Sequence, residues 1–234
     1  LEYDYGTTVL LGRLSIIYVS TLVRMPDVIK RHLMKLFTTA KLDWFDDGCC
    51  DVKYLDVWNK SPLSYKPGQP IDEGWHVDTY ELSLGVDEDG RLFRKAADLL
   101  MRNQFYPHDV LSHTSDFSLW NRWAQVGDRI VQRIHLFKLF GKPIIDVITM
   151  NEVRQVITKP RRYGLTYVTV GHHVEQGEWS ACLEWHDNTE LVLTIHSISR
   201  PVPEEPARNY SFMRAKQKSA HQRGLQHFKQ AVLT

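Results

Sequence analysis

Cysteine is scarce in this chain. Only three cysteines occur among 234 residues, Cys49, Cys50 and Cys182, and their spacing is irregular. An odd count without regular spacing supports neither a disulfide framework nor a structural zinc site, because both need paired or clustered thiols. We therefore expect a protein of a reducing compartment, without a bound metal.

An excess of charge of one sign is also missing, since the formal net charge is only +1. No global field favours a nucleic-acid partner. Locally, residues 43–89 hold twelve acids against three lysines, whereas residues 207–234 hold six Lys and Arg and no acid. These segments are either two solvated surfaces that face each other, or the second is a basic face for an anionic ligand or a membrane.

Long apolar runs are missing as well. Residues 9–23 are apolar but are interrupted by Arg13, Ser15, Ser20 and Thr21. The run is too short to span a membrane, and it lacks the basic start and cleavage site of a signal peptide. We expect a soluble, cytoplasmic protein without stable membrane insertion.

Motifs for nucleotides and for activated nucleophiles are absent too. The sequence contains no Gly-x-Gly-x-x-Gly, no P-loop and no Gly-x-Ser-x-Gly. It therefore predicts no cofactor, and any enzymatic activity has to come from a cavity and a few polar groups.

Helical periodicity appears in three segments. Apolar residues recur at three and four within residues 27–37, 92–103 and about 209–232. Gly224 weakens the last helix by roughly 1 kcal/mol relative to alanine. These segments are predicted to be helices with one buried face.

Strand-like alternation fills the chain between the last two helices. It runs through residues 129–137, 144–153, 163–171, 178–186 and 190–200, and "HDNTE" at 186–190 has the composition of a hairpin turn. About five strands followed by one long helix predict an antiparallel sheet packed on that helix.

Residues 74–234 resemble an uncharacterised family, the domain of unknown function nineteen-ninety. The matching pieces are, in order, "GWH" at 74–76, "LG" at 84–85, "FRKAADLL" at 93–100, "VGDRIVQRI" at 126–134, "RRYGLTYVTV" at 161–170, "GEW" at 177–179, "ISRP" at 198–201 and the helix around Gln217. Two departures stand out: His172 takes the place of a family glycine beside the family histidine His173, and Val192 and Thr194 stand where tryptophan and glutamate are common.

The family is similar to the START/Bet v 1 superfamily, and this resemblance implies the fold. The expected class is α+β, a helix-grip in which a curved antiparallel sheet closes around a long C-terminal helix. The resemblance implies a ligand-cavity domain at 67–234, and residues 1–66 form an N-terminal extension that packs on the sheet or acts as a lid. Fold alone does not select among the carriers, receptors, cyclases and hydrolytic enzymes of this superfamily.

The segment "GHHVEQGE" at 171–178 offers the first candidate chemistry. His172, His173, Glu175 and Glu178 could form a metal site, but adjacent strand residues point to opposite faces and would not share an ion. The alternative is a hairpin loop at a cavity mouth in which a backbone or carboxylate partner holds His173.

Glu184 and His196 are the second candidates. If the polar face of residues 179–186 points inward, Glu184 and His196 could act as acid and base, because a desolvated carboxylate gains proton affinity. In the alternative, Glu184 faces water and pairs with Arg200 or a neighbour.

The expected function is binding of an apolar small molecule of the lipid, polyketide or terpenoid type. The alternatives are a cofactor-free cyclase, pericyclase or isomerase that uses the same cavity, and a protein-interaction domain. The candidate catalytic residues are Glu184, His196 and His173; the candidate ligand contacts are Trp120, Trp123, Tyr167, Trp179, Trp185, Arg200 and Phe212. The sequence indicates no oligomeric state.

Overall fold

A computed structural model describes residues 41–44, 52, 54–55, 62–139, 142–171, 173, 175–203 and 207–234. The chain divides into two compact units, Leu1–Thr38 and Thr39–Thr234, and all described residues belong to the second. The apolar run at 9–23, the helix expected at 27–37 and His172 lie outside the described residues. The account below therefore concerns the second unit.

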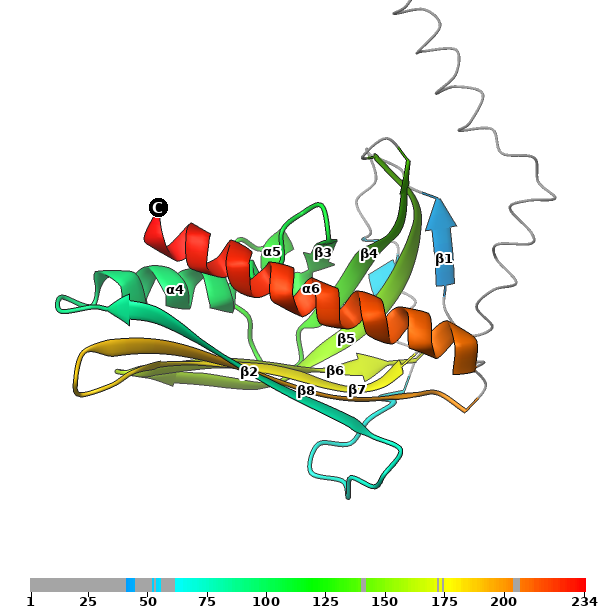
Figure 1. Ribbon diagram of the computed structural model, residues 1–234, viewed down its shortest axis with the longest axis horizontal. Helices are drawn as coiled ribbons and strands as arrows, with labels where there is room; N and C mark the ends of the chain where they lie inside the picture. Colours follow the sequence, from blue (N-terminus) through cyan, green and yellow to red (C-terminus); the bar gives the residue numbers. More distant parts are fainter. Residues whose placement is uncertain are drawn as a thin grey trace, which may run out of the picture. The chain divides into compact units, whose positions relative to one another are not determined.

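Eight antiparallel strands form one sheet (Figure 1). Their order is β2-β8-β7-β6-β5-β4-β3, and β1 pairs with β5 beside this path. The strands are β1 (Lys41–Trp44), β2 (His76–Val86), β3 (Leu111–Ser115), β4 (Arg129–Leu139), β5 (Lys142–Lys159), β6 (Arg162–Val170), β7 (Glu175–Trp185) and β8 (Glu190–Pro201). From β3 to β8, each strand pairs with its neighbour in the sequence, as short turns favour.

This arrangement corrects the expected fold class, the α+β helix-grip of the START/Bet v 1 type. Within the described residues the sheet is open, with β2 and β3 at its two ends, and strands dominate over few helices. The C-terminal helix lies across one side of the sheet in Figure 1. The helix-grip rested on the resemblance to that superfamily alone. Alternation in the sequence indicates that strands exist but not whether their sheet closes around a helix.

Three helices complete the described structure: α4 (Arg91–Met101), α5 (Asp116–Leu119) and α6 (Ala207–Leu233). The N-terminus of α4 is held by Asp87, whose carboxylate accepts hydrogen bonds from the backbone N–H groups of Leu92 (3.3 Å) and Phe93 (2.8 Å). A carboxylate satisfies the free amides of a first helical turn. The predicted helices at 92–103 and 209–232 are thus confirmed to within about two residues.

The main hydrophobic core lies where the sheet meets α4 and α6. It includes Phe93 and Leu100 from α4, Trp179 and Leu183 from β7, and Phe228 from α6. The predicted apolar face of β7 is therefore the buried face, and the alternate side chains of this strand are only half-buried. Burial of this kind stabilises the fold by about 25 cal/mol per Å² of apolar surface.

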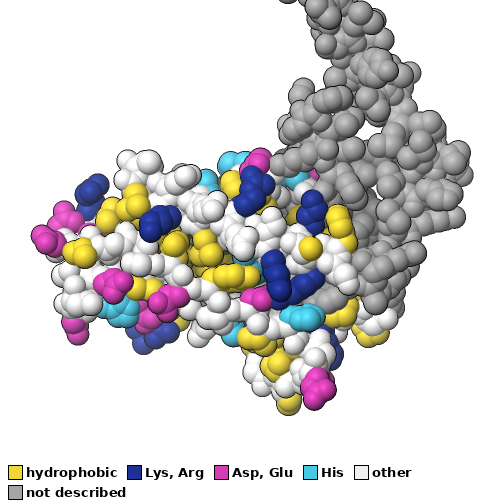
Figure 2. Space-filling view, viewed as in Figure 1, with side chains coloured by type: hydrophobic (Ala, Val, Ile, Leu, Met, Phe, Trp, Pro, Cys, Tyr) yellow, Lys and Arg dark blue, Asp and Glu magenta, His cyan; other side chains and the backbone are white. Residues whose placement is uncertain are grey.

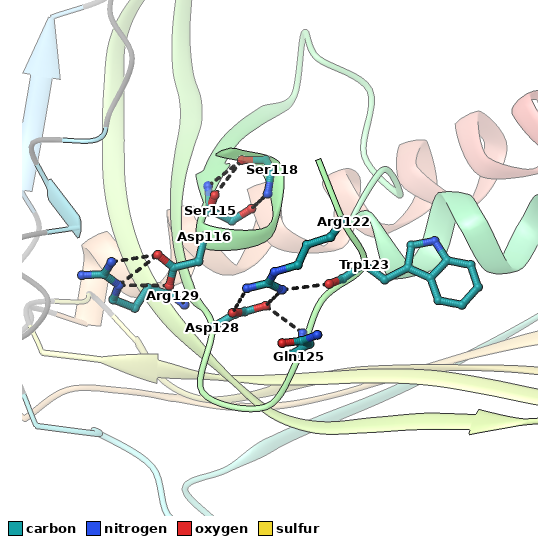
Figure 3. Close-up of polar contacts among 8 residues, drawn as sticks. All are labelled: Ser115, Asp116, Ser118, Arg122, Trp123, Gln125, Asp128 and Arg129. Atoms are coloured by element: carbon teal, nitrogen blue, oxygen red, sulfur yellow. Dashed lines mark hydrogen bonds and ion pairs between the residues drawn. The ribbon is translucent and has the colours of Figure 1, made fainter. Parts of the chain in front are cut away.

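A polar network fixes the loop from α5 to β4 (Figure 3). The Ser115 hydroxyl accepts from the Ser118 backbone N–H (3.1 Å) and caps α5. Arg122 donates two hydrogen bonds of 2.6 Å to the Asp128 carboxylate. Such bidentate pairs constrain the geometry of both side chains, so they hold the conformation of this loop.

The acidic and basic segments meet at an ion pair. Arg214 of α6 pairs with Asp78 of β2, and both side chains are largely buried. Elsewhere on the face shown in Figure 2, Lys and Arg stand in separate groups with hydrophobic and acidic side chains between them. Among the described residues, no helix combines the length and the apolar character needed to cross a membrane.

Candidate ligand-binding site

A cavity of about 120 Å³ lies between the sheet and α6. Strands β3 to β8 supply one side of its lining and α6 the other. The lining residues are Tyr106, Val110, Leu111, Gln132, Ile134, Asn151, Tyr167, Thr169, His173, Glu175, Gly177, Glu178, Trp179, Ser197, Ile198, Ser199, Met213, Gln217, Ala220 and His221.

Aromatic rings form one wall of the cavity. Trp179 of β7 stacks on Tyr167 of β6, with ring centroids 4.9 Å apart and an interplanar angle of 17°. The Tyr167 hydroxyl accepts a hydrogen bond from Gln132 (3.1 Å), whose oxygen accepts from Asn151 (3.1 Å). Burial raises the pKa of Tyr167 and of Tyr106, so both phenols stay neutral.

His173 and Glu175 form the polar end. The backbone N–H of Glu175 donates to His173 Nδ1 (3.0 Å), which leaves the proton of the neutral ring on Nε2. Burial lowers the pKa of His173 to about 4 and raises the pKa of Glu175 to about 7; the positive charge of Arg214 partly opposes the second shift. The two side chains can therefore both be neutral near physiological pH.

Helix α6 completes this end with Gln217 and His221. Gln217 donates to Glu175 Oε2 (3.2 Å). His221 is 2% exposed, its ring packs against Tyr80 and Tyr106, and burial lowers its pKa to about 4. The helix thus presents a neutral amide and a neutral imidazole to the cavity.

Four buried polar atoms of this lining have no hydrogen-bond partner within the described part of the chain. They are Glu175 Oε1, Trp179 Nε1, Ser199 Oγ and His221 Nδ1. A buried polar atom without a partner costs about 1–3 kcal/mol, so such atoms are normally satisfied by water or a ligand. These atoms are available to hydrogen-bond with water or with a polar group of a ligand.

The candidate catalytic residues lie apart. His173 lines the cavity. Glu184 is partly exposed and pairs with Arg162 at 3.5 Å, and His196 is partly exposed with Nδ1 3.1 Å from the Thr79 hydroxyl. Neither Glu184 nor His196 contributes to the lining, because both stand on the faces of β7 and β8 opposite to the buried one.

Of the candidate ligand contacts, Tyr167 and Trp179 line the cavity and five do not. Trp120 is 77% exposed, Trp123 donates to Asp98 (2.8 Å), and Trp185 donates to the Asp87 carbonyl (2.9 Å). Arg200 stacks over Trp75 at 4.4 Å, and Phe212 lies 5.5 Å from Lys216 Nζ. The indoles of Trp123 and Trp185 and the guanidinium of Arg200 thus have partners away from the cavity.

The sequence did carry a signal for the residues that the prediction omitted. Met213, Gln217, Ala220, His221 and Gly224 recur at three and four, in register with the apolar stripe of the last helix. The polar residues Gln217 and His221 interrupt the apolar pattern, so the stripe is harder to recognise. Glu175 and Ser199 occupy inward positions of their strands. Because successive side chains of a strand point to opposite faces, both positions can be predicted once one inward residue of each strand is known.

The possible metal cluster around His173 is only partly visible, since His172 lies outside the described residues. Within the ranges that the structure describes, no three His, Cys, Asp or Glu side chains are grouped so that they could hold a metal ion. His173, Glu175 and Glu178 instead line the cavity individually.

Comparison with known proteins gives one family match. The family described as "Domain of unknown function (DUF1990)" matches residues 61–227. No curated protein matches the chain. Among solved structures, a hypothetical protein from Helicobacter pylori aligns at 14% identity over 69% of this chain and 88% of that chain, with a TM-score of 0.42.

Proposed function

Because the chain belongs to the DUF1990 family, whose description names no function, we propose from the cavity itself that the protein binds a small, mostly apolar molecule carrying one hydrogen-bonding group. The observation that carries this proposal is the set of unpartnered atoms in the cavity lining, Glu175 Oε1, Trp179 Nε1, Ser199 Oγ and His221 Nδ1. Ligand sites commonly combine apolar walls with a few placed polar groups.

The size of the cavity narrows the ligand class. Its volume of about 120 Å³ is close to that of an engineered apolar cavity of about 150 Å³ that accepts benzene. A ligand of one ring or a short branched chain fits this space, whereas a long lipid tail does not. The Tyr167–Trp179 stack supplies an aromatic wall for such a ligand.

Phenol and toluene are suitable probes, because they share a shape and differ in the hydroxyl group. Phenol is expected to bind more tightly in an NMR titration, since its hydroxyl can pair with Ser199. Removing one such hydrogen bond in Ser199→Ala should weaken phenol binding about 2- to 12-fold and leave toluene binding unchanged.

Ser180→Ala is the matched control. Ser180 stands on the same sheet but bonds to the His196 carbonyl (3.4 Å), away from the cavity. Ser180→Ala should change neither the affinity for phenol nor the affinity for toluene. Absence of phenol binding, equal affinity for the two probes, or equal effects of the two serine variants would contradict the proposal.

A second function is favoured by Glu175 itself. A carboxyl group with a pKa of about 7 in an enclosed site suits general acid–base catalysis, because it can both hold and release a proton near neutral pH. We propose proton transfer next to a carbonyl group as the alternative activity. Cyclopentanone in D₂O is the test: the protein should accelerate exchange of its α-protons, and Glu175→Gln should abolish the acceleration, whereas Glu184→Gln should retain it.

A further inference from the structure

A second, larger cavity of about 440 Å³ adjoins the first. The end of α4 and the following turn, strand β3, α5 and the last turns of α6 enclose it. Tyr106 and Leu111 line both cavities, but Glu175, Ser199 and His221 line only the first. The residues of the second cavity are Leu99, Arg102, Asn103, Gln104, Tyr106, His108, Leu111, Ser112, His113, Phe117, Ser118, Asn121, Arg122, His227 and Ala231.

Asn103 is the unusual member of this lining. It is 3% exposed, and neither Oδ1 nor Nδ2 has a hydrogen-bond partner in the part of the chain that the structure describes. Its backbone has a φ of 56° and donates to the Leu100 carbonyl (2.9 Å), which fixes the residue in the left-handed conformation that asparagine tolerates. A buried amide that is held in place but unpaired presents one donor and one acceptor side by side.

His113 supplies a third unpartnered atom. The centroids of its ring and the Phe117 ring are 5.8 Å apart, and Nδ1 has no partner among the described residues. Burial lowers the pKa of His113 to about 4, so the imidazole is neutral. Beside Asn103, the cavity therefore offers an uncharged hydrogen-bonding nitrogen and an aromatic face.

The charged residues of this lining are already paired. Arg102 donates to Asp98 (2.9 Å) and to Asn121 Oδ1 (2.9 Å), and Arg122 is bound to Asp128 through two hydrogen bonds (Figure 3). No carboxylate belongs to the residues lining this cavity. The arginines that line the second cavity are thus paired, and its lining contains no carboxylate. This lining favours a neutral ligand over an anion or a cation.

We propose that this second cavity binds a neutral, planar molecule with a hydrogen-bond donor next to an acceptor, as in a primary amide or the edge of a nucleobase, and that Asn103 recognises that pair. Asparagine matches such an edge with two parallel hydrogen bonds. The volume lies in the usual range of ligand sites, about 300–1,000 Å³, and the Phe117 ring provides a surface for stacking. This site is independent of the proposed function of the first cavity.

Benzamide and N,N-dimethylbenzamide test the proposal, because only benzamide carries the donor. The full chain labelled with ¹⁵N is titrated with each compound, and the side-chain amide signal of Asn103 is followed by NMR. Benzamide should shift this signal and bind at least about tenfold more tightly than the dimethyl compound, as expected for losing a paired hydrogen bond in a site built for it.

The informative variant is Asn103→Gly, with Asn121→Gly as its matched control. Both asparagines line the cavity and both have positive φ, which glycine adopts freely, so both variants should keep the backbone fold. Asn121 is exposed and already bound to Arg102. Asn103→Gly should weaken benzamide binding about tenfold or more, and Asn121→Gly should change it less than about threefold.

Thermal unfolding of both variants confirms that they fold. Failure of benzamide to shift the Asn103 signal at its solubility limit would overturn the proposal, as would equal affinities for the two compounds. The same holds if the two glycine variants bind benzamide equally well. Each of these results leaves the phenol experiment on the first cavity unaffected, because Asn103 does not line that cavity.

Discussion

At the scale of single residues, burial changes the proton affinity of Glu175. It lies inside the first cavity, with one oxygen bound to Gln217 and the other unpartnered among the described residues. Desolvation disfavours its charged form, and the distant positive charge of Arg214 offsets only part of this. Between about pH 4.5 and pH 7, the Glu175 carboxyl group therefore keeps its proton in the folded protein and loses it in the unfolded chain.

This difference predicts a dependence of stability on pH. The pKa of Glu175 is about 7 in the folded state, against an ordinary value of 4.5, so the folded state loses stability as pH rises from about 4.5 to about 7. The loss is at most about 3 kcal/mol. Glu175→Gln cannot ionise, and it should be more stable than the wild type at pH 8 but not at pH 4.5, as measured by urea unfolding.

Glu184→Gln serves as the control for that prediction. Glu184 is partly exposed in its pair with Arg162, and a surface pair of this kind contributes at most about 1 kcal/mol. Glu184→Gln should therefore change the free energy of unfolding only slightly at both pH values. An identical stability difference between Glu175→Gln and wild type at pH 4.5 and pH 8 would contradict the assignment of the ionisable group.

At the scale of elements, the packing of α6 depends on one glycine. A Cβ atom at Gly224 would lie 2.3 Å from Cε1 of Phe105, a fully buried ring that also contacts Trp179 and Phe228. Gly224 costs helix propensity, as the sequence indicates, but it lets the helix approach the core. The close approach also places Gln217 and His221, two turns or less away, against the first cavity.

Gly224→Ala therefore sets two effects against each other. Alanine favours the helix by about 1 kcal/mol, whereas forcing a methyl group into a filled core costs about 1–3 kcal/mol. At 2.3 Å the steric cost should win, and we expect net destabilisation of about 1–2 kcal/mol in urea unfolding. Ser219→Ala, at an exposed position of the same helix, should be neutral or slightly stabilising; stabilisation by Gly224→Ala would show that the helix does not press on Phe105.

At the scale of the whole molecule, three histidines of the described part of the chain with strongly lowered pKa values make stability sensitive to acid. Burial lowers the pKa of His113, His173 and His221 to about 4 each. The unfolded chain protonates these rings near 6.5, so the folded state loses stability as pH falls from about 6.5 towards 4. Glu175 opposes this over part of the range, but one carboxyl group does not balance three imidazoles.

We therefore expect the free energy of unfolding to fall by on the order of 3 kcal/mol between pH 7 and pH 5. His221→Phe removes one of the three groups and should reduce this fall, whereas His186→Asn, at an exposed turn, should leave it unchanged. Urea unfolding at the two pH values measures both. An unchanged fall in His221→Phe would mean that His221 is not a neutral, buried ring.

Much of the architecture could be predicted from the sequence, because periodicity reports burial directly. Strands β4 to β8, α4 and α6 follow from it, whereas β1, β2 and β3 were not predicted. The turn at 186–190 follows as well, and His186 and Glu190 are joined there by a backbone hydrogen bond (2.9 Å). The openness of the sheet does not follow, and the helix-grip prediction was wrong. The register of distant strands and the curvature of a sheet depend on tertiary packing, which a local pattern does not contain.

The candidate sites were harder to predict. Alternation gives two possible faces for β7 and leaves open which one points inward. The candidates Glu184 and His196 depend on an inward polar face, whereas Trp179 and Leu183 belong to the face that is buried. The register also shifts at bulges, as between Val153 and Gln155. The inward positions of one strand therefore do not predict those of its neighbour. Asn103 and His113 sit in a turn and a short strand, where no periodic signal marks them as buried.

The strand order also has a kinetic meaning. Strands β3 to β8 pair with sequence neighbours, so their ladders can form early from nearby contacts. Strand β2 instead pairs with β8, which follows only after two helices and five further strands. Closing so long a loop costs entropy that nearby hairpins do not incur. Substitutions in the β2–β8 ladder should mainly speed unfolding, and those in the β5–β6 hairpin should slow folding. Strand β2 is thus among the strands that join the sheet late, and it carries Asp78, the partner of Arg214 on α6. Completion of this edge of the sheet and docking of the C-terminal helix are therefore expected to be coupled.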